Sequence, residues 1–214
     1  MHDIVERLVS IKKEIQSNNS KAEIVAISKT FPINKILPLI NFGHVNFGEN
    51  KIQEAVEKWT DIKKDFNNIK LHFVGKLQSN KVKYALPLFD YIHSLDSIKL
   101  AEKIANEQQK KKFKPKIFIQ VNIGREVQKS GIEIKNLEKF YSECKKNYDL
   151  NIIGLMCLPP NEKNPNEYFS QMQILKNKLN LNDLSMGMTN DYIEALNYEA
   201  TFIRIGSKIF GERG

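Results

Sequence analysis

The stretch EIVAI, residues 23–27, is a short apolar run rich in β-branched side chains, and the polar loop SKT, residues 28–30, follows it directly. Seven further runs of this kind recur along the chain at intervals of roughly 20–35 residues. They are HVNF (44–47), LHFV (71–74), YIHS (91–94), KIFIQVN (116–122), NIIGLM (151–156), DLSM (183–186) and TFIRI (201–205). Most are continuously apolar rather than alternating, which is typical of parallel strands covered on both faces.

Helical patterns fill most of the gaps between these runs, and one more pattern precedes the first run. Helices are expected over residues 2–17, 97–109, 134–146, 167–179 and 190–198, with Asp96 and Thr189 as N-caps. The gap at residues 75–90 is weak as a helix. Strands that alternate with helices predict an α/β fold, a single (β/α)8 TIM barrel domain over residues 1–214 with an extra N-terminal helix. An open doubly wound sheet is the alternative.

The composition is that of an ordinary globular domain. Of the 214 residues, 41% are hydrophobic and 27% are charged, which excludes collagen, disulfide scaffolds and disordered chains. Polar residues interrupt every apolar run well short of the roughly 18 residues that a membrane span needs, so no membrane partner is expected. The start of the chain lacks the features of a secretory signal. Cys144 and Cys157 are expected to be buried free thiols, and the protein is expected to be cytoplasmic.

The net charge of +8 does not by itself indicate nucleic-acid binding. Lysines make up 29 of the 33 basic residues, and they are spread along the chain. Nucleic-acid-binding proteins more often cluster their charge and favour arginine. A nucleic-acid-binding module is therefore a weak alternative, and we expect no nucleic-acid partner.

In a TIM barrel, the loops that follow the strands carry the chemistry. Lys29 follows the first strand, where burial would favour the neutral amine that condenses with an aldehyde. The loops after the seventh and eighth strands carry Ser185, Met186, Gly187, Arg204, Gly206 and Ser207. Small residues, hydroxyls and a following helix N-terminus favour a phosphate group at these two loops. A lysine amine and a phosphate site at one opening point to pyridoxal 5′-phosphate (PLP) as the cofactor.

Other polar residues near the predicted strand ends have more than one interpretation. Asn50, after the second strand, could contact the cofactor ring, brace Lys29 or cap the next helix. His72 and His93 are interpreted as hydrogen-bonded structural residues of the third and fourth strands. The sequence contains no spacing of histidines, cysteines or carboxylates that indicates a metal site.

A set of motifs in a fixed order extends over nearly the whole chain. They are AISKTFP (26–32), FGENKIQE (47–54), HFVGKLQSNK (72–81), HSLD (93–96), VNIGREVQKSG (121–131), GLMCLPP (154–160), LSMGMTNDY (184–192) and RIGSKIFGER (204–213). With these motifs the sequence resembles the pyridoxal phosphate homeostasis proteins. The resemblance implies a monomeric barrel related to the N-terminal domain of alanine racemase, a fold-type III PLP protein.

The resemblance also implies roles for individual residues. Lys29 would form the Schiff base with PLP, and Arg204 would face the pyridine nitrogen. Ser185 and the backbone of Gly206 and Ser207 would hold the phosphate. Asn50, Met186 and Gly187 complete the expected cofactor-binding set. Beyond PLP, the expected partners are apo PLP enzymes or amino acids.

The resemblance implies intracellular PLP (vitamin B6) homeostasis, as a carrier or buffer without catalytic turnover. Racemisation needs a base on each face of the substrate α-carbon, and the chain ends at Gly214 directly after the eighth strand and its helix. We therefore expect no further domain to supply a second base. An always-protonated arginine at the pyridine nitrogen would also weaken the ring as an electron sink. The alternative is a small PLP-dependent amino-acid racemase or lyase, with Tyr84 as a conceivable second acid or base.

Overall fold

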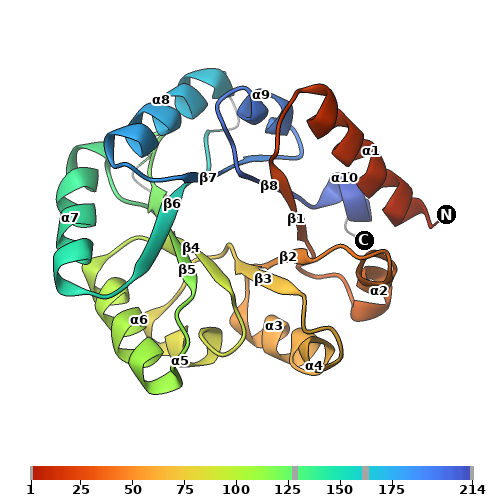
Figure 1. The fold of residues 1–214 in the computed structure, drawn as a ribbon, viewed down its shortest axis with the longest axis horizontal. Coiled ribbons are helices and arrows are strands. Elements are labelled where there is room, and N and C mark those ends of the chain that lie inside the picture. The colour runs from red at the N-terminus through yellow and green to blue at the C-terminus, as the bar shows by residue number, and fades with distance from the viewer. Residues whose placement is uncertain (1, 127–129, 161–163, 213–214) are drawn as a thin grey trace.

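The eight strands form a closed parallel barrel in chain order, and the last strand pairs with the first to close it. In this computed structural model, which describes residues 2–126, 130–160 and 164–212, the helices surround the barrel (Figure 1). The N-terminal helix, α1 (Asp3–Ser17), lies in the same outer layer and contacts the last helices of the chain. The predicted TIM barrel with an extra N-terminal helix is confirmed, and the open doubly wound sheet is excluded.

The barrel strands are short, and most of them are followed by one helix or two. The strands are β1 (Glu23–Ile27), β2 (Asn46–Glu49), β3 (Lys70–Phe73), β4 (Tyr91–Leu95), β5 (Lys116–Val121), β6 (Asn151–Cys157), β7 (Asp183–Met188) and β8 (Phe202–Ile205). The further α-helices are α2 (Ile33–Asn41), α3 (Ile52–Trp59), α4 (Ile62–Asp65), α5 (Val82–Ala85), α6 (Ile98–Lys111), α7 (Leu137–Asn147), α8 (Pro165–Lys178), α9 (Tyr192–Leu196) and α10 (Ser207–Phe210). Two 3₁₀ turns, η1 (Ser79–Lys81) and η2 (Ile134–Asn136), precede α5 and α7.

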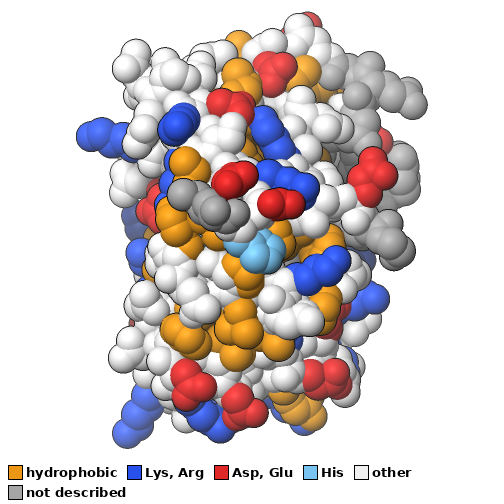
Figure 2. Space-filling view, turned by 90° about the vertical axis from the view of Figure 1, so that its right-hand side faces the viewer, with side chains coloured by type: hydrophobic (Ala, Val, Ile, Leu, Met, Phe, Trp, Pro, Cys, Tyr) orange, Lys and Arg blue, Asp and Glu red, His pale blue; other side chains and the backbone are white. Residues whose placement is uncertain are grey.

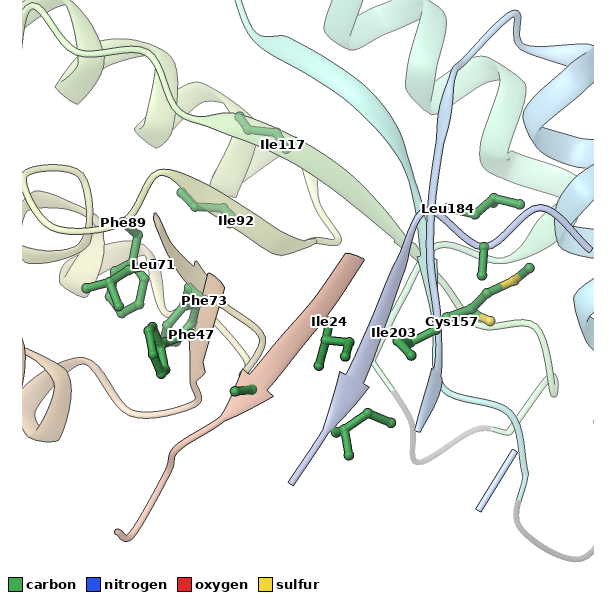
Figure 3. Close-up of a cluster of buried hydrophobic side chains, with 14 of the residues drawn as sticks. Ile24, Phe47, Leu71, Phe73, Phe89, Ile92, Ile117, Cys157, Leu184 and Ile203 are labelled. Atoms are coloured by element: carbon green, nitrogen blue, oxygen red, sulfur yellow. The ribbon is translucent and has the colours of Figure 1, made fainter. Parts of the chain in front are cut away.

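The barrel wall separates two apolar clusters. The larger cluster lies between strands and helices and includes Ile24, Phe47 and Leu184 (Figure 3). The smaller cluster lies inside the barrel and consists of Val25, Ile27, Phe118, Met156 and Phe202. Successive residues of a strand point to opposite faces, so neighbours such as Ile24 and Val25 belong to different clusters. Apolar packing on both faces explains why the strand sequences are continuously apolar.

Both predicted N-caps are wrong. Ser97, rather than Asp96, caps α6, because its hydroxyl accepts the backbone N–H of Leu100. The residue before α9 is Asp191 rather than Thr189, and its carboxylate accepts the backbone N–H of Met188 at 2.6 Å. Thr189 consequently does not cap α9 and lies in the loop that follows β7.

The surface carries no single-sign charge field on the face formed by α1, α2 and α10. Figure 2 shows lysines and arginines interspersed with aspartates and glutamates there.

Among the residues that the structure describes, no helix is long and apolar enough to cross a bilayer. Cys144 and Cys157 are buried and unpaired, as predicted, and burial raises the pKa of each thiol to about 12. Neither thiol is therefore a reactive nucleophile.

Candidate functional site

A cavity of about 860 Å³ opens at the end of the barrel where the strands have their carboxyl termini. Its wall is built from the segments that follow β1, β2, β3, β5, β6, β7 and β8. The predicted site residues in this wall are Lys29, Asn50, Arg204, Gly206 and Ser207. The fold therefore brings Lys29, near the start of the chain, to the same opening as residues near its end.

A buried polar network holds the turn that carries Lys29. The Ser28 hydroxyl donates to Glu49 Oε1 at 2.8 Å, and the Ser28 carbonyl accepts from Lys58 Nζ at 3.0 Å. Glu49 Oε1 also accepts from Lys58 Nζ and from Trp59 Nε1, both at 2.9 Å. The Glu49 side chain is fully buried and that of Lys58 is 8% exposed, so the network is shielded from water.

Thr30, the residue after Lys29, is anchored to α3, the helix that also carries Lys58 and Trp59. Thr30 has a φ of 68°, a left-handed conformation that a β-branched residue rarely adopts. Its backbone N–H donates to Glu54 Oε1, which also accepts from Lys58 Nζ at 2.9 Å. Partial burial acts to raise the pKa of Glu54, but these hydrogen bonds outweigh burial and lower the pKa. Both neighbours of Lys29 are thus tied to α3, which fixes the turn at the rim of the cavity.

The Lys58→Met variant tests this network. It leaves the Glu49 carboxylate buried without its cation, so we expect the free energy of unfolding to fall by about 3–5 kcal/mol. Urea denaturation at neutral pH measures this loss. The matched control is Lys64→Met, because the Lys64–Asp61 pair is solvent-exposed and should contribute little. Equal stabilities of the two variants would show that Lys58 does not support the turn.

The loops after β7 and β8 carry two hydroxyl groups in the cavity wall. Ser207, at the start of α10, donates from Oγ to Thr189 Oγ1 at 3.4 Å, and both residues line the wall. Gly206 lies beside Ser207 in the wall. The loops after β7 and β8 thus place a glycine and two hydroxyl groups together, and such groups can donate hydrogen bonds to an oxyanion of a ligand.

Three predicted residues do not line the cavity. Ser185 is fully buried inside the barrel, where its hydroxyl is bonded to His93 and Arg204. Met186 points the other way, into the apolar layer between strands and helices. Gly187 has a φ of 86°, and a Cβ there would lie 2.7 Å from the Cβ of Ala195 in α9.

These positions correct the sequence-based interpretation of the loop after β7. The register of β7 against β8 shifts between Ser185 and Met188, which changes the face to which the following residues point. Met188 and Thr189 consequently reach the cavity, whereas Ser185 remains below it. Gly187 packs closely against α9, and it does not line the cavity.

Arg204 connects the cavity to the barrel interior. Its side chain lines the wall and is almost fully buried, at 4% exposed. Nη1 donates to Ser185 Oγ at 2.6 Å and Nη2 donates to the Cys157 carbonyl at 2.8 Å. Burial lowers the pKa of Arg204 from its usual value, but a guanidinium remains protonated in proteins. Arg204 therefore presents a fixed cation to the cavity.

Asn50 is not a helix cap, because Lys51 occupies the N-cap position of α3. Its Oδ1 is buried and has no hydrogen-bond partner among the described residues. Gly75 packs directly against the Asn50 backbone, since a Cβ at residue 75 would lie 2.2 Å from the Asn50 carbonyl oxygen. The loops after β2 and β3 are thereby held together at the cavity wall.

Sequence reasoning missed several residues of the site. Thr189 belongs to the loop after the seventh strand, whose hydroxyls indicate a phosphate group, but it is absent from the expected cofactor-binding set. Asp191 and Gln120 also line the wall, and neither has a spacing that distinguishes it from a surface residue. The motifs quoted over 121–131 and 204–213 extend partly outside the described residues.

The chain has relatives that match it over nearly its whole length. Residues 3–214 match the family model of the alanine racemase N-terminal domain. The pyridoxal phosphate homeostasis protein of Aquifex aeolicus is 34% identical, over 98% of this chain and 95% of that protein. The protein of the same name in Haemophilus influenzae is 34% identical, over 98% of this chain and 93% of that protein.

Solved structures agree with these matches. PipY from Synechococcus elongatus, solved without PLP, has a TM-score of 0.90 and is 32% identical, covering 97% of this chain and 100% of PipY. PipY with PLP bound has a TM-score of 0.88 at 31% identity, with the same coverage. Sequence, fold and matched length together show that this chain belongs to the pyridoxal phosphate homeostasis proteins, within the alanine racemase N-terminal domain family.

Proposed function

We propose that this protein binds PLP in the cavity and takes part in intracellular PLP homeostasis as a carrier or buffer. The observation that carries the proposal is that Lys29 lines the same cavity as the hydroxyls of Thr189 and Ser207. Support also comes from PipY, which has been solved with PLP bound and shares the fold along nearly the whole chain.

The residues of the cavity fit the chemical groups of PLP. PLP supplies an aldehyde that a primary amine captures reversibly, and Lys29 is the amine on the rigid turn. Thr189, Ser207 and the backbone at Gly206 would hold the phosphate. Arg204 would face the ring nitrogen. The buried Oδ1 of Asn50 is an incomplete polar group of the kind that a bound ligand or water completes.

The assignment of the phosphate side is tested by comparing PLP with pyridoxal, which lacks the phosphate. Thr189→Val and Ser207→Ala each remove one hydrogen bond to a charged group, which is worth roughly 1.5–3 kcal/mol. We expect each variant to bind PLP about ten- to a hundred-fold more weakly and to bind pyridoxal unchanged. Equilibrium titration followed by absorbance measures both affinities.

The control is Ser130→Ala, because Ser130 lines the cavity on the loop after β5, away from Thr189 and Ser207 in the chain. It should bind PLP like the unmodified protein. A loss of PLP affinity in Ser130→Ala that matches the loss in Ser207→Ala would place the phosphate elsewhere.

The choice of a carrier over an enzyme rests on the acid–base groups of the cavity. Tyr84, the conceivable second acid or base, is 50% exposed and does not line the cavity. An arginine facing the ring nitrogen would keep the ring unprotonated, which disfavours carbanion chemistry. We therefore expect no exchange of the α-proton when the PLP-loaded protein is incubated with L-alanine or L-serine in deuterium oxide. Exchange seen by NMR at a rate above that of free PLP would favour the racemase or lyase alternative.

A further inference from the structure

A line of polar side chains runs through the barrel interior below the cavity. Its upper end is Arg204, whose Nη1 donates to Ser185 Oγ at 2.6 Å. Ser185 Oγ lies 2.8 Å from His93 Nδ1. Both Ser185 and His93 are completely buried, so no solvent competes for these bonds.

The line continues to the opposite end of the barrel. His93 Nε2 lies 3.0 Å from His72 Nδ1, and His72 Nε2 lies 3.1 Å from Asn46 Oδ1. Asn46 Nδ2 then donates to Glu23 Oε2 at 2.6 Å. Glu23 is the exposed first residue of β1, so the line ends at the face of the barrel away from the cavity.

Aromatic rings enclose the two histidines. His72 stacks on Tyr91 with ring centroids 4.1 Å apart, and His93 stacks on Phe118 at 4.5 Å. Phe202 contacts both imidazoles from the side. Burial lowers the pKa of His72 and of His93 well below the usual value, and nearby cationic groups act in the same direction. Both rings are therefore neutral, and each has one N–H donor and one acceptor nitrogen.

The Glu23 end decides the direction in which these donors point. A carboxylate only accepts hydrogen bonds, so the Asn46 amide must turn Nδ2 toward Glu23 and Oδ1 toward His72. His72 must then donate from Nε2 and accept at Nδ1, and His93 must likewise donate from Nε2 and accept at Nδ1. The Ser185 hydroxyl donates to His93 and accepts from Arg204. Each link is thus a donor–acceptor pair, and all of them point away from the cavity.

We propose that Ser185, His93, His72 and Asn46 are positioning residues that form a one-way hydrogen-bonded chain, with Glu23 as its terminal acceptor and Arg204 as the group it holds at the cavity. Ser185 consequently acts on a ligand through Arg204 rather than by contact. The chain itself requires no ligand, whereas its effect on PLP affinity rests on the proposed function.

Imidazole ¹⁵N NMR of the protein without PLP tests the direction of the chain. We expect His72 and His93 to show the Nε2–H tautomer, without titration between pH 6 and 8. Glu23→Lys replaces the terminal acceptor with a donor, which should turn the Asn46 amide and convert both rings to the Nδ1–H tautomer. Glu57→Lys makes the same charge change on the exposed face of α3 and should leave both tautomers unchanged.

An Nδ1–H tautomer in the unmodified protein would overturn the proposed direction. Unchanged tautomers in Glu23→Lys would overturn the role of Glu23. Both readouts are independent of PLP, so they remain decisive if the proposed function fails.

Arginine side-chain NMR tests whether the chain holds Arg204. The polypeptide has only four arginines, so the guanidinium signals can be assigned by substitution. Slow rotation should give resolved Nη signals for Arg204 in the unmodified protein and averaged signals in Ser185→Ala. Ser185→Thr keeps the hydroxyl and should restore the resolved signals. If Ser185→Ala leaves the Nη signals resolved, or if the unmodified protein already shows averaged signals, Ser185 does not position Arg204.

Discussion

Replacing Lys29 with alanine is expected to abolish the covalent capture of PLP. Lys29 is the primary amine on the anchored turn at the rim of the cavity, and the substitution removes that amine while leaving the Ser28 and Thr30 anchors in place. The yellow absorbance of the protein incubated with PLP should disappear. Borohydride treatment followed by peptide mass spectrometry should locate the trapped cofactor on the peptide with Lys29 in the unmodified protein and nowhere in the variant.

Lys76→Ala is the matched control, because Lys76 is a second lysine in the cavity wall. Lys76 is exposed and comes from the loop after β3, whereas the turn that carries Lys29 is tied to α3. We expect this variant to capture PLP like the unmodified protein. Undiminished trapping in Lys29→Ala, or loss of trapping in Lys76→Ala, would assign the capture to a different amine.

The sequence predicts the barrel well because each strand is a local signal. The run at residues 23–27 coincides with β1, because the apolar residues 24–27 form the strand and the polar turn at residues 28–30 ends it. The run at residues 44–47 is shifted from β2, which spans Asn46–Glu49. Glu49 looks like a loop residue in the sequence, but Lys58 and Trp59 compensate its burial from a different element. The sequence around Glu49 does not indicate these partners, because they belong to the following helix, α3.

The candidate site is predictable only where it follows from strand order. The rule that strand ends carry the chemistry locates Lys29, Asn50 and Arg204 in the cavity wall. The same rule fails for Ser185, because β7 extends to Met188 and leaves Ser185 inside the strand, below the cavity. The interpretation of His72 and His93 as hydrogen-bonded structural residues is confirmed. The hydrogen-bonded chain that they join runs through six strands, β1 to β4, β7 and β8, so only the folded barrel reveals it.

The buried histidines should make the protein acid-sensitive before its carboxylates are protonated. Burial lowers the pKa of His44 to about 4, with Lys12 acting in the same direction, although its Nε2 donates to the Asn46 carbonyl at 2.9 Å. Burial also holds the pKa of His72 and of His93 well below the usual value. In the unfolded chain all three would titrate near pH 6.5.

The folded state therefore gains stability from neutral histidines above pH 6.5, and this stability is lost as the pH falls below that value. Between these pKa values the unfolded chain binds protons that the folded protein cannot accept. From pH 7.5 to pH 5, the folded pKa of about 4 makes His44 cost about 2 kcal/mol, and the lowered pKa values of His72 and His93 add losses of the same sign. Because small domains have only about 5–15 kcal/mol of stability, a loss of more than about 2 kcal/mol is a large fraction of it.

Urea denaturation at several pH values between 7.5 and 5 measures this loss. His44→Gln separates one contribution from the others, because glutamine can still donate to the Asn46 carbonyl but does not bind a proton. The stability of this variant should fall by about 2 kcal/mol less than that of the unmodified protein over the same interval. The opposite finding, a loss below 1 kcal/mol in the unmodified protein, would mean that the histidines become protonated in the folded state. The interior chain would then carry a positive charge and could not point in one direction from Arg204 to Glu23.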